Sequence, residues 1–242
     1  MKTHIITYAT HADGKFNSLI NNKFGIEVIV LGWGTKWNGF NDKIIGISNF
    51  LDTIDDEDIV IYLDGFDTEI QKPLEDAIER FKDMNSKVLL SKDFIHNKYV
   101  NPLWNVFSRY TTNRVFSSCK KDLYISAGLQ MGYTKYLKIL YKEAKKYTDE
   151  IKDDQVIISK LCKKFDFIDI DINNNIFFNC GNGQNCNNDA CFVQWPGQMK
   201  WNRIYRAFFE YAKYFIVEYI IIFLIFFSII AYVSRGKFLK NK

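Results

Sequence analysis

Two aspartates stand three residues apart in the segment Leu63-Asp64-Gly65-Phe66-Asp67. Carboxylate oxygens are hard ligands of the kind that Mn²⁺ and Mg²⁺ prefer, and such ions complete their shells with substrate phosphates. The segment follows the apolar run IVIYL at residues 59–63, and ligands of open α/β sheets gather where a strand ends. The sequence therefore predicts a divalent-metal site at Asp64 and Asp67. An ordinary acidic turn is the alternative, because two acids at this spacing occur in many proteins.

Other common catalytic patterns are missing from the sequence. It contains no G-x-x-x-x-G-K-[ST] phosphate loop, no G-x-S-x-G nucleophile elbow and no H-E-x-x-H pair. The three histidines, His4, His11 and His96, are not spaced as a set of metal ligands. The paired aspartates are thus the strongest chemical signal in the chain.

Strand-like and helix-like segments alternate on either side of this pair. Short apolar runs predict strands at 4–9, 26–31, 59–63, 87–91, 166–170 and 176–178. Apolar spacing predicts helices at 16–24, 42–54, 73–84, 134–147 and 153–163. The acidic run DDED at 55–58 is expected to be a solvated loop. This alternation argues for a three-layer α/β domain.

Composition and charge exclude several classes of protein. The 242 residues, 48% hydrophobic and 25% charged, can bury the core of one ordinary domain, so wholesale disorder is excluded. The net charge of +4 is concentrated in the last nine residues, which hold four basic side chains and no acid. The rest of the chain is near neutral and has no broad footprint for nucleic acid. We therefore expect no nucleic-acid partner.

Residues 214–233, YFIVEYIIIFLIFFSIIAYV, carry a single charge, at Glu218. About 20 helical residues span the hydrocarbon core of a bilayer, so this run predicts a single-pass membrane helix, with a buried core helix as the alternative. The expected organisation is a domain at 1–208, a juxtamembrane segment at 209–213, the anchor at 214–233 and a basic tail at 234–242. We expect the domain to face the cytosol, since no signal peptide is visible. The basic tail favours the lumenal alternative.

The five cysteines form no clean disulfide framework. Cys119 and Cys162 are scattered, whereas Cys180, Cys186 and Cys191 cluster in CGNGQNCNNDAC. Free thiols, one local disulfide and a metal site all remain open for the cluster.

Several short segments occur in a characteristic order. They are TYAT at 7–10, LGWGTKWNG at 31–39, DGFDT at 64–68, SAGLQMG at 126–132 and KDDQ at 152–155. In this order and spacing, residues from about 4 to 203 resemble the glycosyltransferase domain of the procollagen lysyl hydroxylase/glycosyltransferase enzymes. More distantly, they are similar to the procollagen galactosyltransferases. The resemblance implies a GT-A-like three-layer sandwich with a mostly parallel central sheet.

The resemblance also implies roles for individual residues on the donor side. Asp64 and Asp67 would hold Mn²⁺ (or Mg²⁺), and Lys43 would lie beside the diphosphate of a UDP-sugar. The residues that would contact the nucleotide or its phosphates are Tyr8, Ala9, Thr10, Trp37, Asp64, Gly65, Phe66, Gly197 and Lys200.

On the sugar side, the resemblance makes Asp153 and Asp154 candidates for binding sugar hydroxyls or serving as the base. Asp93 would contact the donor sugar. The chain departs from the family at two positions: Gln194 stands where the family has a metal-binding histidine, and Ser126 where asparagine is usual. A carboxamide oxygen can bind a hard cation, so Gln194 is the candidate third metal ligand.

The implied activity is metal-dependent transfer of a hexose, galactose or glucose, from a UDP-sugar to a hydroxyl group. The acceptor would be a protein or another hydroxyl compound, with hydroxylysine of collagen-like chains implied by the resemblance. The alternative is a catalytically weakened or inactive module that holds a nucleotide or sugar at the membrane. The apolar helix would make the lipid bilayer a further partner.

Overall fold

The structure is a computed structural model that describes residues 1–93, 114–116, 118–120, 123–181, 186–196 and 211–240, with the side chains of the last helix described as far as Tyr232. The chain forms two compact units, Met1–Gln198 and Met199–Lys242, and each is described by itself. The domain boundaries expected from the sequence stay a prediction.

Within the described residues, the first unit is built on a six-stranded sheet with the order β2-β1-β3-β6-β5-β7. Strand β1 runs parallel to β2 and β3, and β5 runs parallel to β7. Strand β6 is antiparallel to both of its neighbours, β3 and β5. The expected mostly parallel central sheet is therefore confirmed. The strands are β1 (Thr3–Tyr8), β2 (Ile29–Leu31), β3 (Ile59–Leu63), β5 (Val88–Lys92), β6 (Ile125–Tyr133) and β7 (Ile168–Asp171).

A second, three-stranded sheet has the order β4-β9-β8. Its strands are β4 (Thr68–Ile70), β8 (Phe177–Asn179) and β9 (Phe192–Gln194). The sequence did not predict β4 (TEI) or β9 (FVQ), which are short and include polar residues. It also did not predict β6, whose two glycines, Gly128 and Gly132, interrupt the apolar pattern.

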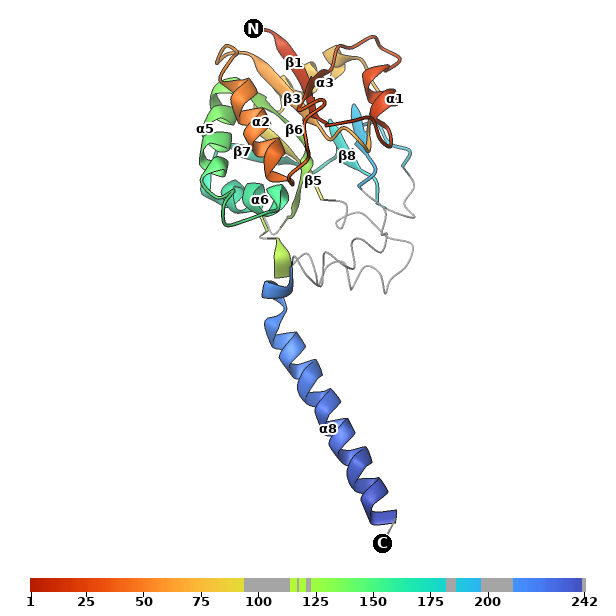
Figure 1. Ribbon diagram of the computed structural model, residues 1–242. Coiled ribbons are helices and arrows are strands. Elements are labelled where there is room, and N and C mark those ends of the chain that lie inside the picture. The colour runs from red at the N-terminus through yellow and green to blue at the C-terminus, as the bar shows by residue number, and fades with distance from the viewer. Residues whose placement is uncertain (94–113, 117, 121–122, 182–185, 197–210, 241–242) are drawn as a thin grey trace. The chain divides into compact units, whose positions relative to one another are not determined.

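Helices cover both faces of the large sheet. They are α1 (Phe16–Ile20), α2 (Asn41–Leu51), α3 (Leu74–Asp83), α5 (Thr134–Lys145) and α6 (Asp154–Lys164). In Figure 1, α2, α5 and α6 lie together on one side of the sheet, and α1 and α3 lie on the other. The predicted three-layer arrangement is thus present, with helices at the predicted places.

Alternate side chains of β3 point to opposite faces of the sheet. Ile59, Ile61 and Leu63 belong to a buried apolar cluster that also contains Phe81 of α3 and Phe192 of β9. All five residues of β3 are buried, as expected for a central strand. The intervening Val60 and Tyr62 therefore face the layer of α2, α5 and α6, and Asp64 follows in the same phase.

The acidic run 55–58 is only partly the solvated loop that we expected. Asp55, Asp56 and Glu57 are exposed, but Asp58 is buried. Its carboxylate accepts a hydrogen bond from the backbone N–H of Lys2 and lies 3.0 Å from Nε2 of His4. The expectation is wrong for Asp58 because Lys2 and His4, at and just before the start of β1, bring hydrogen-bonding groups to it.

Two disulfides join four of the five cysteines, all of which lie in described residues. Cys119 is bonded to Cys162, 43 residues away, and Cys180 to Cys186. Cys191 is free and buried. A local disulfide such as Cys180–Cys186 was one of the possibilities that the sequence left open for the cluster. The Cys119–Cys162 bond was not predicted, because it joins α6 to a segment distant in sequence.

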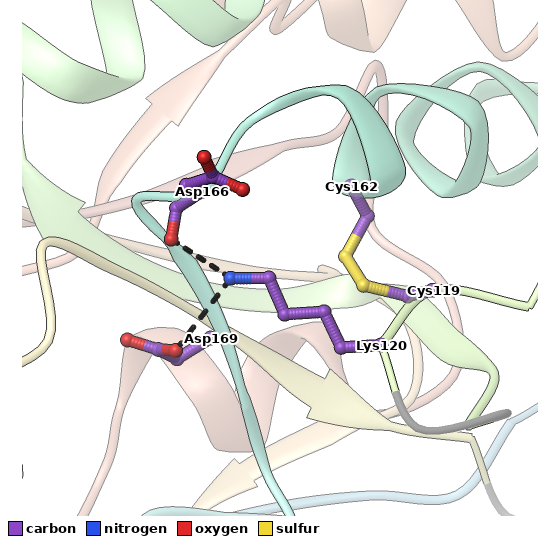
Figure 2. The surroundings of a disulfide bond; sticks show 5 residues. All are labelled: Cys119, Lys120, Cys162, Asp166 and Asp169. Carbon is purple, nitrogen blue, oxygen red and sulfur yellow. Dashed lines mark hydrogen bonds and ion pairs between the residues drawn. A yellow bond between two sulfur atoms is a disulfide. The ribbon is translucent and has the colours of Figure 1, made fainter.

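Figure 2 shows the surroundings of Cys119–Cys162. The neighbouring Lys120 Nζ donates to the backbone oxygen of Asp166 at 2.8 Å and lies 3.9 Å from Oδ1 of Asp169. The disulfide and the lysine together attach the segment before β6 to α6 and to the start of β7.

The second unit contains a short 3-10 helix (Ala212–Tyr214) and the helix α8 (Ile216–Lys240). Large apolar side chains of α8 are exposed from Ile216 to Ile230. Among the described residues, no helix combines the length and apolar character needed to span a membrane. The structure therefore does not support the transmembrane helix predicted at 214–233.

Candidate active site

The turn after β3 carries both aspartates of the predicted metal pair. Asp64 is fixed at the end of the strand, where its backbone N–H donates to the carbonyl oxygen of Gly128 at 2.8 Å. Asp67 precedes β4, and its carbonyl oxygen accepts a hydrogen bond from the backbone N–H of Trp195 at 2.8 Å. Because β4 pairs with β9, the end of β9 lies directly against this turn.

Gln194, at the end of β9, joins the two aspartates. Its Nε2 lies 3.2 Å from Oδ2 of Asp64 and 3.0 Å from Oδ1 of Asp67. Two carboxylates from one turn therefore converge on a single point, which is how a divalent cation would be held. The carboxylates, with a carboxamide beside them, fit a hard cation such as Mn²⁺ or Mg²⁺.

Within the described ranges, no group of three or more His, Cys, Asp or Glu side chains could hold a metal ion. Of the residues that the structure describes, Asp64 and Asp67 are therefore the charged side chains that converge on this point.

Lys43 of α2 lies between two acids of the site. Its Nζ is 2.5 Å from Oδ1 of Asp64 and 3.6 Å from Oδ2 of Asp154. Burial by itself would lower the pKa of Lys43, but Asp64 and Asp154 outweigh it and the pKa is raised. Lys43 is therefore a permanent positive charge at the carboxyl end of β3.

Tyr62 completes the surroundings of Asp64. Its hydroxyl donates to Oδ1 of Asp64 at 2.7 Å, and burial with the nearby carboxylates raises its pKa well above the usual value. Burial alone would raise the pKa of Asp64, but the Lys43 ammonium and the hydrogen bonds from Lys43, Tyr62 and Gln194 lower it overall. Asp64 is therefore ionised at neutral pH.

The start of α6 supplies the next acids. Asp154 is buried and faces Lys43; burial is the main cause that raises its pKa to about 6, against the opposing effect of Lys43. Asp153 is the N-cap of α6, since its carboxylate accepts a hydrogen bond from the backbone N–H of Val156 at 3.2 Å. The two neighbouring acids thus have different environments.

Asp93 follows β5 and is also buried. Its Oδ2 accepts a hydrogen bond from Nε2 of Gln155 at 3.1 Å. This bond links Asp93 to the first turn of α6.

The segments predicted to contact the nucleotide carry exposed aromatic rings. Trp37 and Phe66 are 41% and 37% exposed. The ring centroids of Trp37 and Tyr8 are 6.0 Å apart, and those of Phe66 and His11 are 5.3 Å apart.

Glycines make room beneath these aromatic segments. A Cβ at Gly32 would lie 2.4 Å from the ring of Tyr8, and one at Gly65 would lie 2.9 Å from Oγ1 of Thr7. Backbone bonds tie the first segment to the second: Ala9 N–H donates to Leu31 and Gly34 N–H donates to the carbonyl of Thr10, both at 3.0 Å.

The structure thus brings together five of the predicted site residues: Lys43, Asp64, Asp67, Asp154 and Gln194. Gly197 and Lys200 lie outside the described residues. Three further residues that contact the site, Tyr62, Gly128 and Gln155, were not predicted from the sequence, and Ser126 was noted only as a departure from the family. Strand alternation could have found Tyr62, because residues two apart share a face of the sheet.

Comparison with known proteins identifies a related family. A family model described as the PLOD GT domain matches residues 1–189. No curated protein matches the sequence. The match to the family model ends at residue 189, before Gln194.

Two solved structures are similar to this chain. One is a glycosyltransferase involved in the glycosylation of the major capsid of PBCV-1; it has 11% identity and a TM-score of 0.53, over 84% of this chain and 97% of that chain. The other is the galactosyltransferase LgtC, solved with donor and acceptor sugar analogs, with 14% identity and a TM-score of 0.47, over 81% of this chain and 88% of that chain.

The first likeness shows that the fold is shared with a glycosyltransferase, and the second is too weak to argue from. The family model spans most of the chain and includes the strand, the aspartate pair and the α6 acids described above. The chain belongs to the PLOD glycosyltransferase-domain family and is a glycosyltransferase.

Proposed function

We propose that the chain transfers a hexose, galactose or glucose, from a UDP-sugar to a hydroxyl acceptor in a metal-dependent reaction. The observation that carries this proposal is the convergence of Asp64 and Asp67 on one point, beside Lys43, at the carboxyl end of β3. A site for a diphosphate needs positive charge, and this arrangement provides one fixed cation and a place for a second.

Charge balance supports the metal. Among the described residues, Asp64, Asp67 and Asp154 surround one ammonium group, that of Lys43, so carboxylates outnumber cations in this part of the site. A diphosphate would be repelled unless a divalent ion compensated these acids. Asp64 and Asp67 would hold the Mn²⁺ (or Mg²⁺), with Gln194 beside them. When bound, the ion supplies a Lewis acid that stabilises the charge on the departing UDP.

The chain's own residues would bind and orient the donor. Trp37 and Phe66 offer exposed ring faces for the uracil and ribose, next to Tyr8, Ala9, Thr10 and Gly65. Lys43 would donate to a diphosphate oxygen and would add fixed positive charge there. Gly197 and Lys200 belong to the same proposal through the resemblance.

On the acceptor side, we assign the base to Asp154. A carboxyl group with a pKa near 6 is ionised at neutral pH and can accept the proton of an attacking hydroxyl. Asp93 and Asp153 would hold sugar hydroxyls. Hydroxylysine of collagen-like chains is the acceptor that the resemblance suggests, and other hydroxyl compounds remain equal candidates.

The test is UDP-sugar hydrolysis by the full chain, because a transferase that lacks its acceptor can pass the sugar to water. A panel of UDP-sugars is incubated with Mn²⁺ or with EDTA, and UDP release is measured. We expect Mn²⁺-dependent release from UDP-galactose or UDP-glucose, lost in Asp64→Asn. The matched control is Asp52→Asn, which changes an exposed aspartate after α2.

Unchanged release in Asp64→Asn would overturn the assignment of the site. Mn²⁺-dependent UDP binding without release, with every donor and with collagen-like or simple hydroxyl acceptors, would favour the non-catalytic binding module instead.

We further propose that the apolar C-terminal segment attaches the chain to a lipid bilayer. The exposed apolar side chains of α8 from Ile216 to Ile230 support this. The two disulfides favour the lumenal orientation over the cytosolic one, because disulfides form and persist in oxidising compartments. Alkaline carbonate extraction of membranes from expressing cells tests the attachment: release of the chain into the supernatant would overturn it.

A further inference from the structure

Gln194 occupies the point on which the two site carboxylates converge. Its side chain is almost completely buried, with 3% of the residue exposed. A primary amide has two N–H donors, and Nε2 of Gln194 faces one carboxylate oxygen of Asp64 and one of Asp67, at 3.2 and 3.0 Å. The amide nitrogen therefore lies where a shared cation would lie.

The orientation of this amide is fixed by its other contacts. Oγ of Ser126 accepts a hydrogen bond from the backbone N–H of Gly128 at 3.3 Å and lies 3.4 Å from Oε1 of Gln194. The hydroxyl proton of Ser126 is thus directed at the amide oxygen. A reversed amide would place Oε1 against two carboxylates, which is electrostatically unfavourable.

Packing confines the amide as well. An added Cβ at Gly128 would lie 2.4 Å from Nε2 and 2.6 Å from Oε1 of Gln194. The amide therefore lies directly over the Cα of this glycine. The oxygen that could bind a cation points toward Ser126 and away from the two aspartates.

The other oxygen of Asp64 is held separately. Lys43 and Tyr62 both donate to Oδ1, so Oδ2 is the oxygen that is turned toward Gln194 and Asp67. The two carboxylates consequently keep a metal-ligating arrangement through donors that belong to the chain itself.

We propose that Gln194 is a built-in substitute for the metal. It holds Asp64 and Asp67 in place when no metal is bound, and a divalent cation must displace its amide nitrogen in order to bind. Gln194 therefore competes with the cation and makes its binding weaker and more readily reversible. This inference rests on the proposed function, because it takes Asp64 and Asp67 as the metal ligands.

The test is a titration of the full chain with Mn²⁺ in the absence of nucleotide. Electron paramagnetic resonance measures the free Mn²⁺ that remains at each step. Removing a competitor should strengthen Mn²⁺ binding, whereas removing a ligand should weaken it. We expect Gln194→Ala to bind Mn²⁺ about tenfold more tightly than the unchanged chain, because the cation no longer has to displace an amide that is hydrogen-bonded to two carboxylates. Gln194→His should bind still more tightly, because imidazole suits transition metals. Weaker binding by Gln194→Ala would overturn the inference and make Gln194 a ligand.

Three controls accompany this measurement. Gln130→Ala removes another buried glutamine, whose amide bonds Ala127 and Tyr141 instead of the aspartates, and its Mn²⁺ affinity should equal that of the unchanged chain. Ser126→Ala should raise the affinity, since it frees the amide oxygen. Circular dichroism establishes that each variant is folded, and Mn²⁺ should raise the melting temperature of Gln194→Ala more than that of the unchanged chain.

The outcomes separate this inference from the proposed function. Asp64→Asn and Asp67→Asn should each weaken Mn²⁺ binding in the Gln194→Ala background. If neither does, or if no variant binds Mn²⁺, the proposed metal site itself fails. If both do while Gln194→Ala alone binds less tightly than the unchanged chain, only the competitor role fails.

Discussion

Asp64 has a donor for each of its carboxylate oxygens. Lys43 and Tyr62 hold Oδ1, and Gln194 holds Oδ2. Hydrogen bonds to the charged form of a carboxyl group favour that form, so Asp64 is ionised and is held in place by donors of the chain itself. Such preorganisation lowers the cost of reorganisation during the reaction.

The arrangement of Asp64 and Gln194 requires a glycine at position 128. We predict that Gly128→Ala will lower UDP-sugar hydrolysis by about 100-fold, the scale expected when site groups shift by about 1 Å. An added Cβ would lie 2.4 Å from Nε2 of Gln194 and 2.8 Å from Oδ2 of Asp64. Overpacking should also lower the free energy of unfolding by about 1–3 kcal/mol.

The matched control is Gly132→Ala on the same strand. A Cβ there would lie 2.9 Å from the carbonyl oxygen of Lys87, away from the aspartates. It should lose stability to a similar extent and keep its hydrolysis rate. An equal loss of rate in both variants would show that the effect at Gly128 is merely structural.

Asp154 should give the reaction a pH dependence. Burial raises its pKa to about 6, so the carboxylate form that can accept a proton becomes populated as the pH rises through 6. We predict that the hydrolysis rate will rise over this range and that Asp154→Asn will remove the dependence. A pH–rate profile of both proteins measures this, and the same profile in Asp154→Asn would exclude Asp154 as the base.

The same shift has the opposite effect on stability. A carboxyl group whose pKa is raised on folding binds its proton more tightly in the folded state. Its contribution to the free energy of unfolding is therefore present at low pH and is lost as the pH rises through 6. Asp154 is thus stabilised in its neutral form by the fold, although its charged form is the one assigned to the reaction.

At the scale of elements, the site is assembled by short strands and by one helix terminus. The pairing of β4 with β9 brings Gln194 to Asp67, and β6 brings Gly128 and Ser126 against the amide of Gln194. The first turn of α6 brings Asp154 to Lys43 of α2. Each contact joins elements that are far apart in the sequence.

Asp153 begins α6, and its role as an N-cap can be separated from a role in binding sugar. We predict that Asp153→Ala will lower the free energy of unfolding by about 1 kcal/mol, while Asp153→Ser will preserve it, because serine also caps helices. Chemical denaturation measures both. Equal destabilisation by the two substitutions would contradict the cap. If the hydrolysis rate falls in both variants, Asp153 also has the proposed contact with a sugar hydroxyl.

At the scale of the whole molecule, the two disulfides attach segments beside the site. Cys119–Cys162 fixes α6 to the segment that precedes β6, and Cys180–Cys186 closes the chain between β8 and β9. Each bond stabilises a domain by roughly 2–4 kcal/mol. Such bonds form and persist in oxidising compartments, which is the basis of the lumenal orientation proposed above.

The number of free thiols tests this arrangement. We predict that the chain, alkylated during extraction from the cells that make it and then denatured, will show one reactive thiol, Cys191. The four disulfide-bonded cysteines should react only after reduction. Mass spectrometry of the labelled peptides measures this. Five reactive thiols before reduction would contradict the disulfides and would favour the cytosolic orientation.

Much of the fold could be read from the sequence because its signals are local. The run IVIYL predicted the central strand, and its uniformly apolar character predicted burial on both faces. Apolar spacing placed α2, α3, α5 and α6 within a few residues of their ends. Strands β4, β6 and β9 were missed, since β4 and β9 are short and include polar residues and β6 contains glycines that break the apolar pattern.

The sequence by itself determined that an acid pair follows a buried strand, and the resemblance pointed to Lys43, Asp154 and Gln194 as their companions. Only the tertiary structure decided how these side chains meet: that Lys43 lies between Asp64 and Asp154, and that Gln194 turns its nitrogen toward the acids. The reason is physical. Periodicity records which side of a strand or helix is buried, but a contact such as Asp64 with Gln194, 130 residues apart, depends on strand pairing. The direction of an amide depends on the donors and acceptors that this pairing places around it.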